Sequence, residues 1–124
     1  GKDSYEIRQA GAQQVLVSSS RLMALMEVQA EEHLDPSLAE LIPRLNCKNL
    51  DLILVEGFKH EAIPKVELYR PSLKKPLLHP DDNNIIAIAS DEILELNNNI
   101  EQLDLNDIDS LADYIQHFIK NWTA

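Results

Sequence analysis

The sequence predicts an α/β protein in which helices pack on a mainly parallel β-sheet. Two short runs are predominantly apolar, at residues 50–55 and 85–89, and both end abruptly in polar residues. Such runs are typical of strands that are buried on both faces of a parallel sheet. Helical patterns lie at residues 35–45 and 107–122. Helices that alternate with buried strands indicate a layered fold.

The two helical patterns have recognisable starts. Asp35 followed by Pro36 supplies an N-cap acid and a proline at the first helical position. Pro43 falls within the apolar pattern that follows, so this helix must kink or end early. Asn106 or Asp107 can cap the last helix. The last helix carries one broad apolar face, formed by Ile108, Leu111, Ala112, Ile115, Phe118, Ile119 and Trp122.

The N-terminal third predicts a helix and a β-hairpin. Residues 5–12 have a helical pattern, with Gly11 near a C-terminal stop. Residues 14–18 and 22–28 are strand candidates separated by a serine-rich turn, which favours a hairpin. Residues 22–28 are apolar at nearly every position, so this strand is expected to be central or covered by a partner subunit. A helix over residues 21–30 is the alternative.

The remaining segments are a strand, a loop and a second short strand. Residues 65–70 alternate apolar and polar side chains, which is typical of a half-exposed or edge strand. Residues 71–84 hold three of the six prolines and predict an irregular loop. Residues 102–105 are a short strand candidate. All of these segments fit one domain spanning residues 1–124.

Composition restricts the classes of partner. The formal net charge is −10, from 11 basic and 21 acidic residues, which makes nucleic acid and anionic membranes poor electrostatic partners. The one cysteine, Cys47, excludes an internal disulfide and fits a reducing cytoplasm. No apolar run approaches the roughly 18 residues of a membrane span. We therefore expect a cytoplasmic protein that binds neither nucleic acid nor membrane.

The best candidate for a site is Glu56 with Gly57, at the C-terminal tip of the first apolar run. Open α/β sheets bind ligands at this end of their strands. Magnesium is commonly held by one carboxylate together with substrate phosphates and water, and a glycine lets backbone approach phosphates closely. Lys59 is close enough in sequence to meet an anion near Glu56. The alternative is a strand-ending acid, a turn glycine and a surface lysine.

A second candidate precedes the first helix. Lys2, Asp3 and Ser4 place a cation, an anion and a hydroxyl together. Exposed backbone N–H groups at a helix start, helped by Lys2, can bind a phosphate. The alternative is that Asp3 or Ser4 simply caps the helix.

Asp91 follows the second apolar run and is a candidate for base recognition. A carboxylate in this position can accept hydrogen bonds from N1–H and N2–H₂ of guanine. The usual GTPase signature adds an asparagine or threonine and a lysine ahead of the aspartate, but Ile88, Ala89 and Ser90 stand here. The alternative is that Asp91 caps the following turn.

The order and spacing of these motifs resemble the molybdopterin-guanine dinucleotide biosynthesis protein B family over nearly the whole chain. The segments that carry the resemblance are GKDSY at 1–5, AGA at 10–12, LDLILVEGFKHE at 50–61, IAIASD at 86–91 and the helix start at 107–112. The resemblance implies a P-loop NTPase-like fold and a GTP-binding protein, generally a homodimer. Members assist a partner guanylyltransferase that joins GMP to molybdopterin, and their own GTP hydrolysis is weak.

The resemblance also assigns roles to residues. Glu56 matches the acid of the family's Walker B-like strand, a catalytic position that holds Mg²⁺ directly or through water. Gly57 and Lys59 match the continuation of that motif. The segment from Lys2 to Ser4, Asp3 included, matches the part that faces the nucleotide or pterin site.

The sequence departs from the family in its phosphate-binding part. Only three glycines are present, Gly1, Gly11 and Gly57, so no Gly-x-x-x-x-Gly-Lys-[Ser/Thr] motif can occur. We expect the chain to be the C-terminal part of the domain, without its first strand, P-loop and first helix, and to bind GTP poorly by itself. The alternatives are a nucleotide-free interaction module that docks on the guanylyltransferase or on its own copy, and a small-molecule kinase of the P-loop class.

Overall fold

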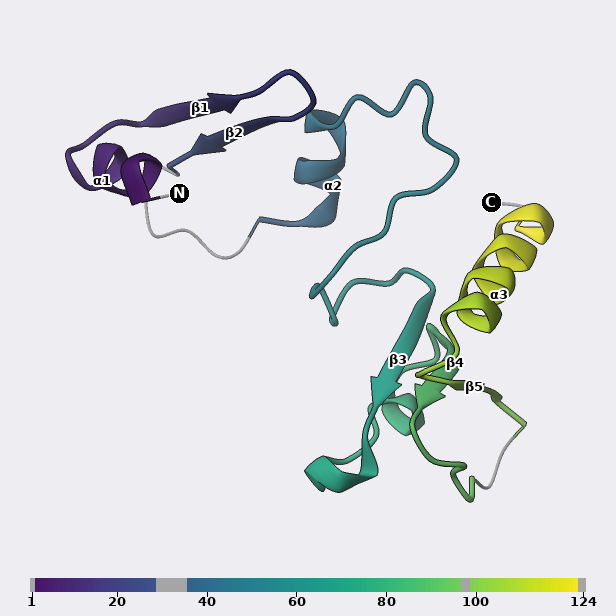
Figure 1. The fold of residues 1–124 in the computed structure, drawn as a ribbon. Helices are drawn as coiled ribbons and strands as arrows, with labels where there is room; N and C mark the ends of the chain where they lie inside the picture. The colour runs from purple at the N-terminus through teal and green to yellow at the C-terminus, as the bar shows by residue number, and fades with distance from the viewer. Residues whose placement is uncertain (1, 29–35, 97–98, 123–124) are drawn as a thin grey trace. The chain divides into compact units, whose positions relative to one another are not determined.

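The computed structural model describes residues 2–28, 36–96 and 99–122 (Figure 1). The chain divides into two compact units, Gly1–Ile42 and Pro43–Ala124. The second unit contains a parallel sheet and the first an antiparallel hairpin. The predicted α/β class is confirmed. None of the helices in the described part is long and apolar enough to cross a membrane.

The first unit contains helix α1 and the predicted hairpin. Helix α1 (Lys2–Gln9) is followed by strands β1 (Gln14–Ser18) and β2 (Met23–Glu27), which pair antiparallel. The turn is closed by Ser19, whose Oγ accepts hydrogen bonds from the backbone N–H groups of Arg21 and Leu22 at 3.3 and 3.1 Å. The hairpin prediction is confirmed and the alternative of a helix over residues 21–30 is wrong.

One face of the hairpin is bare within the described part of the chain. Leu16 and Leu25 are register partners, and Met23 lies on the same face; they are 61%, 60% and 68% exposed. On the other face Val15 is buried, and α1 contacts β1. Strand β2 pairs only with β1 among the described residues, so the expectation of a central strand is wrong. Covering by a partner subunit stays a prediction.

Helix α2 (Leu38–Leu41) is short and passes into a 3₁₀ turn at Ile42–Arg44. Ser37 begins the helix, and its backbone N–H donates to Glu40 Oε2 at 2.9 Å. Pro43 lies in the 3₁₀ turn, which confirms that this helix ends early. Asp35, the predicted cap, lies outside the described residues.

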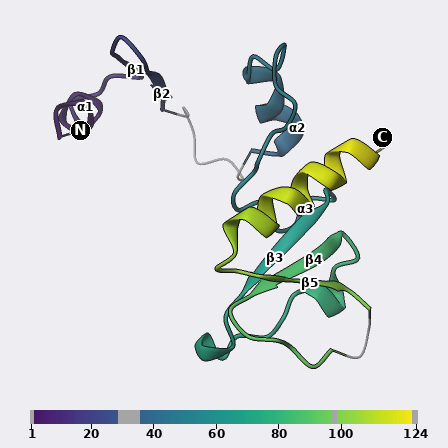
Figure 2. The same cartoon turned by 45° about the vertical axis from the view of Figure 1, so that its right-hand side comes forward.

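The second unit is built on a three-stranded parallel sheet of order β3-β4-β5, with α3 over one of its faces (Figure 2). The elements are β3 (Lys65–Tyr69), β4 (Ile85–Ser90), β5 (Glu101–Asp104) and α3 (Ile108–Asn121), with 3₁₀ turns at Pro71–Leu73 and His79–Asp81. Ala87, Ile88 and Ala89 of β4 have no exposed surface. These elements confirm the predicted second apolar strand, the edge strand, the short strand and the last helix.

The strand predicted at residues 50–55 is not formed. Within the described residues this segment has no strand partner, and Leu50 and Leu54 are 53% and 75% exposed. A strand needs a neighbour that accepts and donates its backbone hydrogen bonds. The apolar side chains of the segment line a cavity instead of a sheet interior.

Two polar side chains of β3 hold the loop that leads to β4. The carboxylate of the buried Glu67 accepts hydrogen bonds from the backbone N–H groups of Leu78 and His79 at 2.8 and 2.9 Å. Lys65 Nζ pairs with Asp82 Oδ2 at 2.7 Å. Asp82 Oδ1 also accepts from the backbone and side-chain nitrogens of Asn84, both at 2.9 Å. The Lys65 and Asn84 hydrogen bonds together lower the pKa of Asp82 from 3.8 to about 2.

We expect Asp82 to make the stability of this unit sensitive to acid. A depressed pKa contributes stability that is fully present above the unfolded value of 3.8 and is lost as the pH falls toward about 2. Asp82→Asn should therefore flatten the loss of stability across this window, as measured by urea unfolding at a series of pH values. Asp51→Asn, which changes an exposed carboxylate outside this network, is the control. An Asp82→Asn profile as steep as the wild type's would contradict the assignment.

Candidate functional site

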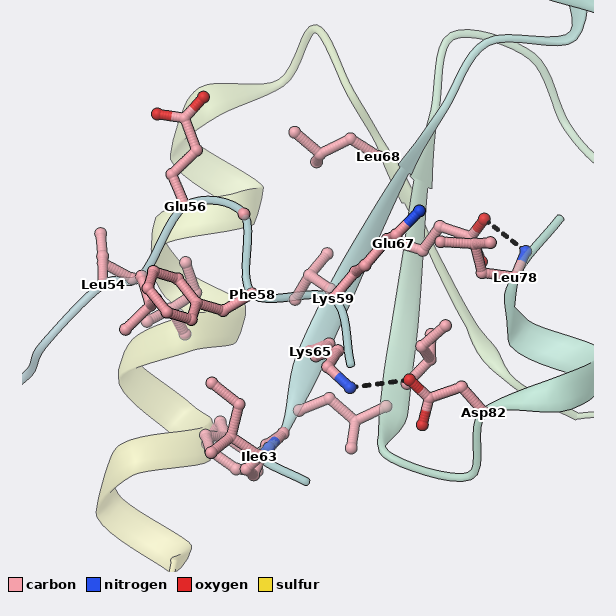
Figure 3. A pocket seen from close by; sticks show the side chains of 18 of the residues that line it. Leu54, Glu56, Phe58, Lys59, Ile63, Lys65, Glu67, Leu68, Leu78 and Asp82 are labelled. Atoms are coloured by element: carbon pink, nitrogen blue, oxygen red, sulfur yellow. Dashed lines mark hydrogen bonds and ion pairs between the residues drawn. The ribbon is translucent and has the colours of Figure 1, made fainter. Parts of the chain in front are cut away.

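A cavity of about 470 Å³ opens in the second unit between the segment at residues 52–59, the sheet and α3 (Figure 3). Strands β3 and β4 form one wall, and Tyr114, Ile115 and Phe118 of α3 form another. Most of the lining is aliphatic or aromatic. The polar groups are Glu56, Lys59, Lys65, Glu67, Asp82 and the hydroxyl of Tyr114, which donates to the Ile86 carbonyl at 3.2 Å.

The turn after Glu56 is a left-handed one. Gly57 has φ +81° and Phe58 has φ +47°. The next turn, over residues 58–61, is closed by the backbone N–H of Glu61, which donates to the Phe58 carbonyl at 3.0 Å. A Cβ added at Gly57 would meet nothing within 4 Å, so the glycine serves the backbone conformation and leaves open space beside it. A phosphate could approach the Gly57 backbone, as the sequence predicts, only if this space is open.

Glu56 is exposed, and its carboxylate points away from the Lys65–Asp82 ion pair (Figure 3). Within the described ranges no group of three or more His, Cys, Asp or Glu side chains could hold a metal ion. A single carboxylate fits Mg²⁺ where water and ligand phosphates complete the coordination. Glu56 is the carboxylate that the sequence predicts for this role, and its exposed position leaves it open to such a ligand.

Lys59 lines a second cavity, of about 380 Å³, in the same unit. Its lining residues are Lys59, His60, Lys65, Leu78, Asp81, Asp82 and Asn84. Both Lys59 and His60 are exposed in the turn that follows Phe58. The structure therefore brings Lys59 next to the Lys65–Asp82 pair, a neighbourhood that sequence spacing did not indicate.

Asp91 follows the last residue of β4 and pairs with Arg70, which follows the last residue of β3. Asp91 Oδ2 accepts from Arg70 Nη1 at 2.9 Å. The turn after β4 is capped by Ser90, whose Oγ accepts from the backbone N–H of Glu92 at 3.2 Å. The structure therefore gives the turn-capping hydrogen bond to Ser90 and an ion pair to Asp91. Arg70 was missed because only the register Tyr69↔Ser90 places it beside Asp91.

Lys2, Asp3 and Ser4 lie inside the first turn of α1, in the first unit. Lys2 pairs with Glu6 at 3.7 Å, and both side chains are largely exposed. Ser4 is 9% exposed. Asp3 and Ser4 lie within α1, so the alternative that either of them is its N-cap is wrong. These residues belong to a different unit from Glu56 and Asp91.

Comparison with known proteins assigns the class. The sequence model described as molybdopterin guanine dinucleotide synthesis protein B matches residues 1–91, a range that contains every candidate site residue. A molybdopterin-guanine dinucleotide biosynthesis adapter protein of Escherichia coli (strain K12) is 46% identical over 122 residues, covering 97% of this chain and 67% of that protein. The fold and these matches define the class: an α/β protein related to molybdopterin-guanine dinucleotide biosynthesis proteins. The chain belongs to the molybdopterin guanine dinucleotide synthesis protein B family.

Two further matches agree with this family assignment. The adapter protein of the same name from Haemophilus influenzae (strain ATCC 51907 / DSM 11121 / KW20 / Rd) is 35% identical, covering 98% of this chain and 65% of that protein. A crystal structure of molybdopterin-guanine biosynthesis protein B superposes with a TM-score of 0.62 at 20% identity, covering 98% of this chain and 76% of that one. The structural match establishes the fold. The chain spans about two thirds of the length of the curated relatives it matches.

We expect Gly57→Ala to destabilise the second unit by about 1–2 kcal/mol, the cost of a left-handed conformation for a residue with a Cβ. No steric clash adds to this, because the space beside Gly57 is open. Urea unfolding measures the change. His60→Ala, a change at an exposed position three residues further on, is the control. Equal stability of Gly57→Ala and wild type would show that the turn relaxes to negative φ.

Proposed function

We propose that this chain is part of a GTP-binding accessory protein of molybdenum cofactor biosynthesis. It would act in the cytoplasm and assist a guanylyltransferase in joining GMP to molybdopterin. The observation that carries the proposal is the family match over residues 1–91, which includes the Glu56 turn and Asp91. Hydrolysis of GTP would be weak at most, because Glu56 is the one catalytic candidate among the site residues.

In this proposal the site residues of the second unit contact different parts of the nucleotide. Glu56 would organise Mg²⁺, and Gly57 would let the backbone approach the phosphates. Lys59 would meet an anionic group, and Asp91 would recognise guanine. Open space beside Gly57 and the position of Asp91 at the carboxyl edge of the sheet support this arrangement. We propose separately, from the family match, that the segment from Lys2 to Ser4, with Asp3, faces a nucleotide or a pterin.

We further propose that the chain is the C-terminal part of one P-loop NTPase-like domain. Strand β3 is an edge strand in the described sheet, and the segment at residues 52–56 has no strand partner among the described residues. The cavity of about 470 Å³ lies between them and is mostly apolar. One further parallel strand would satisfy the open backbone edge of β3 and fill this space. In P-loop proteins the phosphate-binding loop directly follows such a strand.

This proposal predicts that the chain binds GTP poorly by itself. A phosphate-binding loop supplies a ring of backbone N–H groups and a lysine, and the sequence contains no such motif. Titration with a fluorescent GTP analogue, with and without Mg²⁺, measures the affinity. Submillimolar, magnesium-dependent binding by this chain would contradict the proposal.

The matched experiment uses a longer protein that carries a family phosphate-binding loop ahead of this chain. There we expect GTP binding that depends on Mg²⁺, and Glu56→Gln should remove most of the magnesium dependence. Lys75→Ala, an exposed loop substitution, is the control. Binding that is magnesium-dependent and unaffected by Glu56→Gln would exclude Glu56 as the metal ligand.

A second candidate function is protein docking, and the bare face of the hairpin favours it. Leu16, Met23 and Leu25 form an exposed apolar cluster on a two-stranded sheet. Isolated two-stranded hairpins are marginally stable, so a covering partner would stabilise this unit. We propose that a second copy of the chain covers this face in a homodimer, or that the guanylyltransferase does.

We expect Leu25→Glu to abolish self-association, because it places a charge in the centre of the apolar cluster. Sedimentation equilibrium measures the change, with Ser20→Glu in the hairpin turn as a control of equal charge. A Leu25→Glu variant that remains dimeric would exclude this face as the dimer contact. Capture of the guanylyltransferase that is lost in Leu25→Glu and retained in Glu56→Ala would instead assign the face to that partner.

A further inference from the structure

The Arg70–Asp91 ion pair lies at the edge of the sheet where ligands bind. The parallel register pairs Tyr69 with Ser90, so the residues that follow them emerge side by side. Open α/β sheets bind ligands outside the carboxyl ends of their strands. A fixed contact between two charged side chains at this edge therefore influences what the edge can bind.

One carboxylate oxygen of Asp91 is buried, and the other is bound by Arg70. Oδ2 accepts from Arg70 Nη1 at 2.9 Å. Oδ1 is buried and has no hydrogen-bond partner within the part of the chain that the structure describes. In this conformation a guanine base cannot be held by both carboxylate oxygens. Recognition of the base by Asp91 requires the carboxylate to turn outward and leave Arg70.

Turning outward is inexpensive. The Arg70 side chain is 50% exposed and that of Asp91 is 22% exposed, and ion pairs this close to water contribute little to stability. Burial of an ionised oxygen without a partner is itself unfavourable, so leaving this position recovers solvation. The conformation in which Asp91 contacts Arg70 is therefore held by a weak contact that a ligand can replace.

Arg70 and guanine offer the carboxylate the same chemistry. A guanidinium presents parallel N–H donors in a planar fork, and the N1–H and N2–H₂ groups of guanine do so as well. Adenine presents an acceptor and a donor on the corresponding edge and cannot replace the fork. We propose that Arg70 is an intramolecular competitor that occupies Asp91 until a base with two adjacent N–H donors displaces it. This inference rests on the proposed role of Asp91 in guanine recognition.

The test uses this chain, because Arg70 and Asp91 both belong to it and base recognition does not need a phosphate loop. The ¹⁵N-labelled chain is titrated with millimolar GMP or AMP, and the amide shifts of the loop that starts at Asp91 are followed. We expect GMP-selective shifts. Arg70→Ala should tighten GMP binding about two- to fivefold, the range that an exposed ion pair contributes. Arg70→Lys, which keeps the charge and loses the fork, should tighten GMP binding less than Arg70→Ala does, and Asp91→Ala should lose the selectivity.

Each other outcome rejects a different statement. GMP-selective shifts that are unchanged in Arg70→Ala overturn the competition and leave guanine recognition standing. Weaker GMP binding in Arg70→Ala also overturns it, because Arg70 then contacts the nucleotide. No GMP-selective shift in the wild type or in Arg70→Ala overturns the role of Asp91 itself. Lys75→Ala, which removes one positive charge from an exposed loop, controls for net charge.

Discussion

The pairing of β4 between two parallel neighbours is the constraint on which the second unit depends. Ala87, Ile88 and Ala89 have no exposed surface, so β4 cannot shift by one residue without moving buried side chains to the opposite face. That register sets Arg70 beside Asp91 at one edge of the sheet. At the opposite edge of the sheet, Lys65 at the start of β3 forms an ion pair with Asp82 in the loop that leads into β4.

Much of this fold follows from local patterns. The apolar run at residues 85–89, the broad apolar face of α3 and the hairpin each depend on short stretches of sequence, and the structure contains all three. The apolar run at residues 50–55 has an equally strong pattern and forms no strand. An apolar pattern expresses a preference for burial, whereas a strand also needs a hydrogen-bonding neighbour. Whether a neighbour exists is not encoded in the run itself.

The candidate site likewise has one part that the sequence could predict and one part that it could not. Glu56, Gly57 and Lys59 are adjacent in sequence, so their grouping could be predicted, and the left-handed φ of Gly57 accounts for the glycine. The Arg70–Asp91 pair joins residues 21 positions apart and exists only because two strands share a register. Long-range pairs of this kind require the sheet topology, which spacing alone does not supply.

We propose one physical explanation for several features of the second unit. Residues 52–56 have no strand partner among the described residues, and β3 has an open edge in the described sheet. Leu54 and Leu68 beside the cavity are 75% and 69% exposed. Parallel sheets are normally covered, because their strands are apolar on both faces. A strand inserted beside β3 would bury these side chains, and running parallel it would end at the edge that carries Arg70 and Asp91. The same addition that completes the core would therefore bring a phosphate-binding loop to the edge where a base could displace Arg70.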